Sequence, residues 1–373
     1  MNICFFGTYD RNYSRNQILL KGLPQAGVEV IEVHKDLSII KLDKKGDISS
    51  VAILYRFLRK FLFLPVLFSK ITEIRKSDIL LCPYPAHLDL PLCFFVAKIF
   101  GKPVIFDPLF SLTDVFINDF GILPGKSLVA YIFKKIEGFI FSLPDIILAD
   151  TPYQSDNYQK LFGLHHSRIK IIPLGADNSL YKSTPIKKRN DKFRVIYFGL
   201  YNPVHGLEFV VEAARILKRE DLEFLFIGEG QTYNNIVSLV KKYKLSNIDF
   251  LKLKEKEAIP ILQKADVFLG LFGASHTVFR TIANKVLQGL SLGKAVITSQ
   301  GAAINSVFKD HQHLLLVKPQ DGQAIARAIL EIKNNPALKK KLEENGYKIF
   351  NEKFTPRAVG LTLKKVIIEG VAD

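Results

Sequence analysis

Four side chains that could bind a phosphate-bearing ligand lie close together between residues 280 and 288. They are Arg280, Asn284, Lys285 and Gln288. They follow a loop of small and polar residues, 273–276, which begins where an apolar run ends. A guanidinium, an ammonium and the free backbone N–H groups at a helix start suit a phosphate group. The spacing therefore predicts an anion site at this loop.

The elements that must position these side chains are two strands and a helix between Ala265 and Ser299. Val267–Phe272 is an almost unbroken apolar run, as expected of a parallel strand buried on both faces. The helical pattern that follows carries apolar residues on one face, at Ile282, Val286, Leu287 and Leu290, and ends at Gly293. In an open parallel sheet, ligands bind beyond the carboxyl ends of the strands.

The run RTIANKVLQGLSLGKAVI, which starts at Arg280, resembles the signature of glycosyltransferase family 4, the retaining enzymes of the GT-B fold. That family has two glutamates eight positions apart, the second of which holds the ribose of a nucleotide-sugar. Arg280 and Gln288 stand at these two places here. A glutamine amide still bonds ribose hydroxyls, and an arginine offers a bidentate fork to a diphosphate.

The resemblance implies an α/β protein with two Rossmann-like parallel-sheet domains that face each other across a cleft. The acceptor-side domain is expected at 1–183, together with a helix of 356–373 that crosses back to it. The nucleotide-sugar-binding domain is expected at 184–355. The likeness covers nearly the whole chain and is strongest from Phe193 to Phe354. Apart from the resemblance, strands that alternate with helical stretches predict parallel sheets in both halves.

The resemblance also indicates where the leaving diphosphate would be stabilised. The family has a basic residue directly after the glycine that ends the first strand of the second domain, and a lysine before a later glycine. Here Leu200 follows Gly199, and His205 precedes Gly206. We therefore expect Arg280 and Lys285 to supply the missing positive charge. The alternative is that these two side chains form a solvated helix face.

Several other residues complete the expected donor site. Gly273 and Asn284 belong to the loop and helix start described above, and Gly228 and Gly230 form a Gly-x-Gly turn after another strand. That turn is a weak signal, because such glycines often serve only tight-turn geometry.

The first domain contributes candidates at its own strand ends. Gly7 would let its backbone approach the donor phosphates, and Arg15 and Asn16 would reach the site from the first helix. Asp107, after the strand KPVIF, is the best candidate for holding the reacting sugar or the acceptor hydroxyl. A structural Asp-Pro turn is its rival interpretation.

Composition limits the class of protein. The 373 residues fit two domains, and 48% hydrophobic with 24% charged residues indicates a globular chain. Three cysteines lie in apolar segments, which predicts buried thiols. The N-terminus shows no secretory signal, and the longest uncharged apolar runs are too short to span a bilayer. We therefore expect a cytoplasmic protein.

The net charge of +16 calls for an anionic partner. The segment Val51–Lys76 mixes bulky apolar residues with six basic ones, which favours docking on an anionic membrane surface. Its alternative is an amphipathic helix packed on its own domain, and Pro65 predicts two short helices instead of one. Nucleic-acid binding ranks far behind, because no recognition motif accompanies the charge.

No Asp-x-Asp pair and no cluster with metal-ligand spacing occurs in the sequence, so no metal and no cofactor are expected. The function predicted is metal-independent, retaining transfer of a sugar from a nucleoside-diphosphate-sugar to a lipid-linked or glycan acceptor, on the cytosolic face of the membrane. The alternative is a catalytically silent GT-B relative that acts as a binding or scaffold subunit. Leu200 and Gln288 motivate that alternative.

Overall fold

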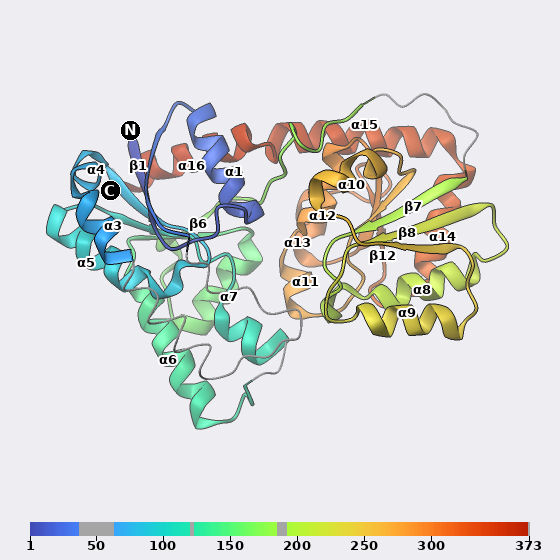
Figure 1. Cartoon of the computed structure of the whole chain (residues 1–373), viewed down its shortest axis with the longest axis horizontal. Coiled ribbons are helices and arrows are strands. Elements are labelled where there is room, and N and C mark those ends of the chain that lie inside the picture. Colours follow the sequence, from blue (N-terminus) through green and yellow to red (C-terminus); the bar gives the residue numbers. More distant parts are fainter. Residues whose placement is uncertain (37–62, 120–122, 185–191, 372–373) are drawn as a thin grey trace. The chain divides into compact units, whose positions relative to one another are not determined.

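The chain folds into two units, and each unit contains a six-stranded parallel sheet (Figure 1). The computed structural model describes residues 1–36, 63–119, 123–184 and 192–371. Unit 1 consists of Met1–Gly175 and Pro356–Asp373, and unit 2 of Ala176–Thr355. The predicted fold class, two Rossmann-like parallel-sheet domains, is confirmed.

Unit 1 has the strand order β2-β1-β3-β4-β5-β6. Its strands are β1 Asn2–Gly7, β2 Glu29–His34, β3 Ile79–Cys82, β4 Val104–Phe106, β5 Ile146–Ala149 and β6 Ile169–Ile171. Its helices are α1 Ser14–Gln25, α3 Leu64–Ser69, α4 Ile71–Lys76, α5 Leu90–Phe100, α6 Leu128–Ser142, α7 Pro152–Phe162 and α16 Pro356–Val371. A π-helical segment, η3 Asp114–Asp119, and the short 3₁₀ turns η2 Ala86–Leu88 and η4 His166–Arg168 lie in its loops.

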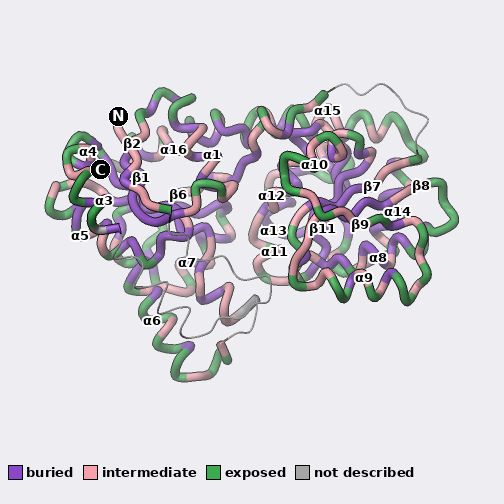
Figure 2. Tube along the Cα trace, in the orientation of Figure 1, coloured by how far each residue is buried: buried purple, intermediate pink, exposed green. Residues whose placement is uncertain are grey.

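Both faces of the unit 1 sheet are buried, as the apolar strand sequences predict (Figure 2). Side chains alternate along a strand, so Ile3 and Phe5 pack on one face while Cys4 and Phe6 pack on the other. Helices α1 and α16 cover the first face, and α5, α6 and α7 cover the second. The three cysteines are free and buried, which confirms the prediction for the thiols.

Unit 2 has the strand order β12-β11-β10-β7-β8-β9. Its strands are β7 Phe193–Phe198, β8 Leu222–Ile227, β9 Ile248–Leu251, β10 Val267–Leu269, β11 Ala295–Ser299 and β12 Leu315–Val317. Its helices are α8 Leu207–Ile216, α9 Tyr233–Lys242, α10 Glu255–Leu262, α11 His276–Arg280, α12 Asn284–Ser291, α13 Ala302–Val307, α14 Gly322–Asn334 and α15 Pro336–Lys353. A 3₁₀ turn, η5 Pro203–His205, precedes α8.

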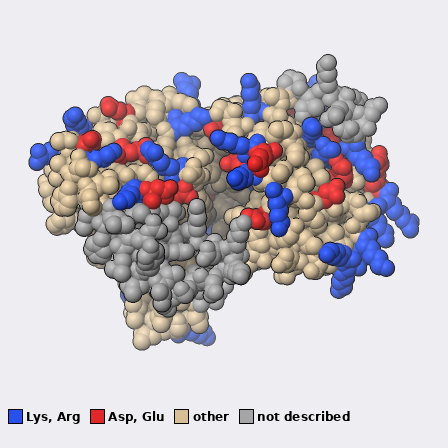
Figure 3. All heavy atoms as spheres, viewed as in Figure 1, with Lys and Arg blue, Asp and Glu red and all other residues tan. Residues whose placement is uncertain are grey.

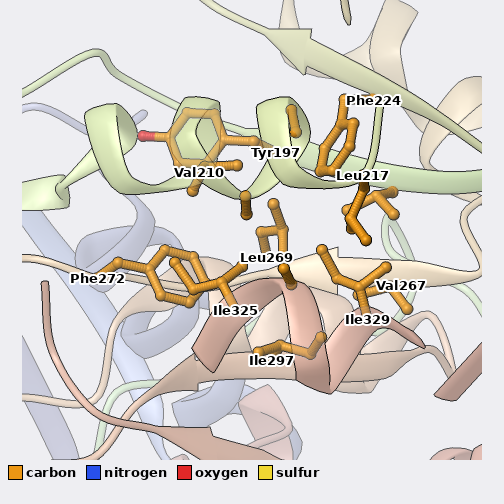
Figure 4. Packing of buried hydrophobic residues seen from close by; sticks show 14 of the residues in the cluster. Tyr197, Val210, Leu217, Phe224, Val267, Leu269, Phe272, Ile297, Ile325 and Ile329 are labelled. Carbon is orange, nitrogen blue, oxygen red and sulfur yellow. The ribbon is translucent and has the colours of Figure 1, made fainter. Parts of the chain in front are cut away.

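The order of the strands marks where unit 2 would bind a ligand. It is the doubly wound order in which the chain starts at the centre with β7, winds outward to β9, and returns to β10 on the other side. The crevice at this reversal, beyond the carboxyl ends of β7 and β10, is the usual ligand site of such sheets. Below it, apolar side chains of β7, β10, α8 and α14 fill the core (Figure 4).

The sequence predicted one helix where the structure has two. Helix α11 ends at Arg280 and α12 begins at Asn284, with residues 281–283 between them. Arg280 therefore does not share a helix face with Lys285, contrary to the prediction. The sequence predicts a domain boundary after residue 183, whereas in the structure unit 1 ends at Gly175 and unit 2 begins at Ala176. The polar, charge-rich run Ser183–Lys192 predicts a linker between the domains, and most of it, 185–191, lies outside the described residues.

The described part of the predicted membrane segment, residues 63–76, packs on unit 1. It forms the two short helices α3 and α4, but the break lies at Lys70, and Pro65 lies in the first turn of α3. Phe63, Leu67 and Ile74 are buried. Residues 51–62 lie outside the described residues. Among the described helices, none has both the length and the apolar character required to cross a membrane.

Two glycines set how closely α1 and α16 pack. A Cβ added at Gly22 would lie 2.0 Å from the carbonyl oxygen of Pro356, and one added at Gly360 would lie 2.2 Å from the carbonyl oxygen of Gly22. We expect Gly22→Ala and Gly360→Ala each to destabilise the protein by about 1–3 kcal/mol, because the helices must separate. Chemical denaturation measures this.

Gly138→Ala in α6 is the matched control, since its added Cβ would meet nothing closer than a contact of 3.5 Å with Phe162. It should be neutral or stabilise by up to about 1 kcal/mol, because alanine has the higher helix propensity. An equal loss of stability in all three variants would contradict the packing argument.

Candidate functional site

A buried lysine occupies the carboxyl end of β7. Lys285 lies in the first turn of α12 and is only 7% exposed. Its Nζ donates a hydrogen bond of 2.7 Å to the hydroxyl of Tyr197 and lies 3.9 Å from the centroid of that ring. Figure 4 shows the Tyr197 oxygen pointing away from the apolar side chains of the core. The phenol thus joins the hydrophobic core to a polar cluster at the strand end.

The backbone carbonyl of Leu200 holds the cluster together. It accepts from the Tyr197 hydroxyl at 2.6 Å and from Nδ1 of His205 at 2.7 Å. That Nδ1 lies 3.3 Å from Nζ of Lys285. Burial, and then the neighbouring ammonium, lower the pKa of His205 well below its usual value. His205 is therefore neutral at physiological pH, and Lys285 is the side chain of the cluster that can bring a positive charge to the site.

In the part of the chain that the structure describes, this ammonium has no carboxylate beside it to balance its charge. Among the described residues, the ion pairs do not include Lys285, and burial alone lowers its pKa well below the usual value. A buried cation without a counter-ion is costly, and an anionic ligand would relieve that cost. The arrangement is suited to binding an anion.

The position of the ammonium explains a departure from the family pattern. Nζ of Lys285 lies 3.4 Å from the point where a Cβ of Gly199 would be. The ammonium thus lies beside the glycine after which the pattern has its basic residue, while the side chain of Leu200 is 67% exposed. That Lys285 replaces that basic residue stays a prediction.

The glycines of unit 2 serve close backbone contacts between the loops. A Cβ at Gly273 would lie 2.2 Å from the carbonyl oxygen of Val204, and one at Gly206 would lie 2.5 Å from the amide nitrogen of Gly273. The loops that follow β7 and β10 can therefore touch only if both positions are glycine.

The Gly-x-Gly turn after β8 packs in the same way. A Cβ at Gly228 would lie 2.1 Å from the carbonyl oxygen of Gly199, and one at Gly230 would lie 2.7 Å from the amide nitrogen of Tyr201. The structure gives this turn a packing role against the loop of Gly199. A donor-binding role for Gly228 and Gly230 stays a prediction.

The start of α12 adds a polar atom to the site. The Oδ1 atom of Asn284 is buried and has no hydrogen-bond partner among the described residues. Buried polar atoms are normally paired, so an unpaired one at a predicted site is consistent with a missing ligand donor. Asn284 and Lys285 are adjacent in the first turn of the helix.

A chain of hydrogen bonds fixes Gln288 one turn further along α12. Its Nε2 donates to the hydroxyl of Tyr181 at 2.8 Å, and that hydroxyl donates to the carboxylate of Glu255. The Tyr181 hydroxyl has a single proton, which it donates in the hydrogen bond to Glu255. The residue at 288 must therefore be a donor, which a glutamine is and an ionised glutamate is not. This accounts for Gln288 in place of the family glutamate.

The candidates in unit 1 bind mainly to one another. Nε of Arg15 lies 2.8 Å from Oδ2 of Asp107, and the two side chains are 1% and 2% exposed. The same guanidinium donates to the carbonyl oxygens of Ile172 and Pro173, at 3.1 and 2.6 Å. The structure thus brings Arg15 and Asp107 together as a buried ion pair. Their predicted contacts with donor or acceptor stay predictions.

Gly7 and Asn16 also have partners inside unit 1. A Cβ at Gly7 would lie 2.9 Å from Oδ2 of Asp89, which accepts from the backbone and hydroxyl of Thr8. A carboxylate next to Gly7 disfavours a phosphate at this loop. Nδ2 of Asn16 donates to the carbonyl oxygens of Asp10 and Tyr84, so it ties loops together instead of capping α1.

Asp150 is a further buried acid at a strand end of unit 1. It follows β5, is 5% exposed, and its carboxylate oxygens have no hydrogen-bond partner among the described residues. Burial raises its pKa to about 7, while the Arg15 guanidinium acts in the opposite direction. Asp150 therefore titrates near neutral pH.

Sequence reasoning missed three residues of unit 2, namely Tyr197, Tyr181 and Glu255. A tyrosine two positions before Gly199, in an otherwise apolar strand, was a signal for the first. The other two were not recognisable, because Tyr181 and Glu255 are far apart in the chain. No group of three or more potential metal ligands was found among the residues that the structure describes.

The C-terminal part of the chain is similar to a known protein family. Residues 182–349 match a family model described as "Glycosyl transferases group 1". These residues lie within unit 2 and include the cluster at Lys285.

Curated relatives share this assignment. An uncharacterized glycosyltransferase of Methanocaldococcus jannaschii is 28% identical over 174 residues, which is 47% of each chain. A putative colanic acid biosynthesis glycosyltransferase of Escherichia coli is 22% identical, over 59% of this chain and 58% of that protein. The chain thus spans roughly half the length of these relatives.

Solved structures share the fold along the whole chain. HepE of Anabaena in complex with UDP has a TM-score of 0.72 at 13% identity and covers 99% of this chain and 100% of its own. Sucrose-phosphate synthase of Thermosynechococcus elongatus has a TM-score of 0.70 at 16% identity, with coverage of 100% and 99%. These similarities confirm the GT-B architecture.

The hydrogen-bond chain at Gln288 yields a reciprocal test. Gln288→Glu should destabilise the ligand-free protein by roughly 1–3 kcal/mol, because two carboxylates then compete for one hydroxyl proton. Adding Glu255→Gln should restore most of that loss, since the new amide donates where the carboxylate accepted. Equilibrium unfolding of the four variants of the cycle measures the coupling. In a Tyr181→Phe background the effects of the two substitutions on the free energy of unfolding should simply add. Undiminished coupling there would contradict the hydrogen-bond chain through Tyr181.

The buried ammonium predicts a pH dependence of stability. The folded-state pKa of Lys285 is lowered, so between that pKa and the usual value near 10.5 the unfolded chain binds more protons. Stability should therefore rise with pH across this window. Lys285→Met should remove that rise and stabilise the ligand-free protein at pH 7 by roughly 1–3 kcal/mol. Urea unfolding at several pH values measures both, and a loss of stability at pH 7 would contradict an uncompensated charge.

Proposed function

We propose that this chain transfers a sugar from a nucleoside diphosphate to a glycan or lipid-linked acceptor, because residues 182–349 match the family model of group 1 glycosyltransferases. The single observation that carries the proposal is the ammonium of Lys285, which is buried at the carboxyl end of β7 without a carboxylate partner among the described residues. A diphosphate supplies the missing negative charge, and it is also the leaving group of such a reaction. HepE of Anabaena, which shares the fold, was crystallised with UDP and with UDP-glucose.

In the proposed reaction, Lys285 stabilises charge that develops as the glycosidic bond breaks. The bond between the sugar and the diphosphate oxygen loses its electron pair to that oxygen, and a preorganised cation lowers the free energy of this state. The acceptor hydroxyl oxygen forms the new bond to the anomeric carbon, and its proton passes to the released diphosphate. The Tyr197 hydroxyl holds the ammonium in place at 2.7 Å. Arg280, at the end of α11, is proposed as the second cation. The product would keep the anomeric configuration of the donor.

Gln288 is proposed to bind the ribose of the donor. Its Nε2 is engaged by Tyr181, which directs the amide oxygen to accept from a hydroxyl. Asn284 and the N–H groups of Gly273 and the α12 start would contact the phosphates. The reaction needs no metal in this proposal, because the cations of the protein take the role that a divalent ion has elsewhere.

The acceptor is proposed to be a growing cell-surface polysaccharide or glycoconjugate at the cytosolic face of a membrane. The E. coli relative named above is described as a putative enzyme of colanic acid biosynthesis. The rival proposal is a silent relative that binds the nucleotide without transferring the sugar. Release of the nucleoside diphosphate from a panel of nucleotide-sugars separates the two, because a silent relative would bind donors and release nothing.

Ligand binding tests the role of Lys285 directly. UDP, GDP or ADP should raise the melting temperature of the wild type, whereas the corresponding nucleoside should have little effect, because the ammonium binds the diphosphate. Lys285→Met should weaken diphosphate binding about 10- to 100-fold, as expected for a lost charge-assisted hydrogen bond.

Lys241→Met on the exposed face of α9 is the control and should bind as the wild type does. Arg280→Ala combined with Lys285→Ala should reduce transfer far more than His205→Ala, because His205 is neutral. Diphosphate binding that survives Lys285→Met unchanged would overturn the proposed role.

A further inference from the structure

Helix α6 of unit 1 exposes a set of large apolar side chains. Leu128 is 72% exposed, Phe139 62% and Ile136 55%, and Val129, Tyr131 and Ile132 are exposed as well. The helix projects from the sheet of unit 1 (Figure 1). Single exposed apolar residues are ordinary, but a group of this size on one helix marks an interaction surface.

The exposed residues form a continuous stripe. At 100° per residue, Leu128, Val129, Ile132, Ile136 and Phe139 fall within an arc of about 100° and extend over about 16 Å of the helix. The opposite side is buried in unit 1 through Ala130, Glu137, Ile140 and Phe141. The helix thus has one apolar face for its own core and a second one that faces outward.

The acidic residue of α6 is buried, whereas its two basic residues are exposed. Its one acidic residue, Glu137, points inward, where its carboxylate accepts from Ser111 and from the backbone and hydroxyl of Thr113. Lys134 and Lys135 are exposed, and Nζ of Lys135 lies 5.6 Å from the ring centroid of Tyr131. At the lowest part of unit 1 in Figure 3, the described surface is tan with a few blue side chains. The exposed face is therefore apolar and cationic.

A cavity beside the stripe contains both lysines. It has a volume of ≈ 500 Å³, and α7 contributes Leu161 and Phe162 to its wall opposite Lys134, Lys135 and Phe139. Two lysines together with apolar side chains in the lining match a phosphate-bearing headgroup whose chains continue into an apolar phase. Lysines next to apolar side chains are typical of helices that lie in a membrane interface.

We propose that α6 docks this protein on an anionic lipid bilayer, with the stripe inserted among the acyl chains and with Lys134 and Lys135 at the headgroup phosphates. This deepens the proposed function, since it names the surface that would bring the enzyme to a lipid-linked acceptor. The docking surface lies in unit 1, whereas the proposed donor site lies in unit 2, and docking requires no bound donor. In the described part of the segment predicted from sequence, 63–76, Phe63, Leu67 and Ile74 are buried and Phe68 is 69% exposed. Membrane docking through Val51–Lys76 stays a prediction.

Vesicle binding tests the proposal. The full-length protein should sediment with vesicles of phosphatidylcholine and phosphatidylglycerol, and weakly with phosphatidylcholine alone, because anionic lipids attract the lysines. Lys134→Glu with Lys135→Glu should lower partitioning to anionic vesicles at least about tenfold, and so should Ile132→Ser with Phe139→Ser.

Matched controls separate α6 from the general charge and apolarity of the protein. Lys241→Glu with Lys242→Glu on α9 changes the net charge equally, and Ile216→Ser with Leu361→Ser removes two exposed apolar residues of other helices. Both pairs should keep most of the vesicle binding. The α6 variants should also keep the UDP-induced rise in melting temperature, which shows that they are folded and that docking is distinct from donor binding.

Two results would overturn the proposal. One is vesicle binding that the α6 substitutions leave unchanged. The other is a wild-type dimer, seen by sedimentation velocity, that Ile132→Ser with Phe139→Ser converts to a monomer without loss of vesicle binding. The stripe would then be an interface between two copies of the chain.

Discussion

A buried ammonium at the end of β7 is the constraint around which unit 2 is organised. Lys285 lies beside Gly199, is held by the Tyr197 hydroxyl, and has no carboxylate partner among the described residues. Folding alone does not favour such a charge, because desolvation costs free energy that a hydroxyl and a ring do not fully offset. This cost supports the proposal that the site binds a partner with negative charge, and the Tyr197 hydroxyl holds the ammonium in place.

The same site shows how one substitution can depend on another. A glutamate at position 288 and the carboxylate of Glu255 would both require the single proton of the Tyr181 hydroxyl. Gln288 resolves this conflict, because an amide donates to the hydroxyl and keeps an oxygen for a ligand. The departure from the family pattern is thus compatible with a working donor site. It follows from local hydrogen-bond directions and does not by itself indicate a lost activity.

Unit 1 uses its charges differently. Arg15 and Asp107 neutralise each other inside the fold. Glu137 of α6 points into unit 1, where it accepts a hydrogen bond from the backbone of Thr113. The outward side of α6 is left apolar and basic, which an aqueous protein surface does not require. In the proposal developed above, unit 2 binds the soluble donor and unit 1 meets the lipid phase. The two tasks use separate surfaces and can be tested apart.

The sequence by itself determined the fold class, because apolar strands that alternate with amphipathic helices admit parallel sheets and little else. It also indicated the 280–288 region, through residue types that suit a phosphate. It could not show that Arg280 and Lys285 lie on different helices, because residues 281–283 continue the helical pattern. The partners of Lys285 and Gln288 were decided by tertiary structure alone. Tyr197 and Tyr181 precede them by about 90 to 110 positions, and only the fold of unit 2 brings these hydroxyls within hydrogen-bond distance of α12.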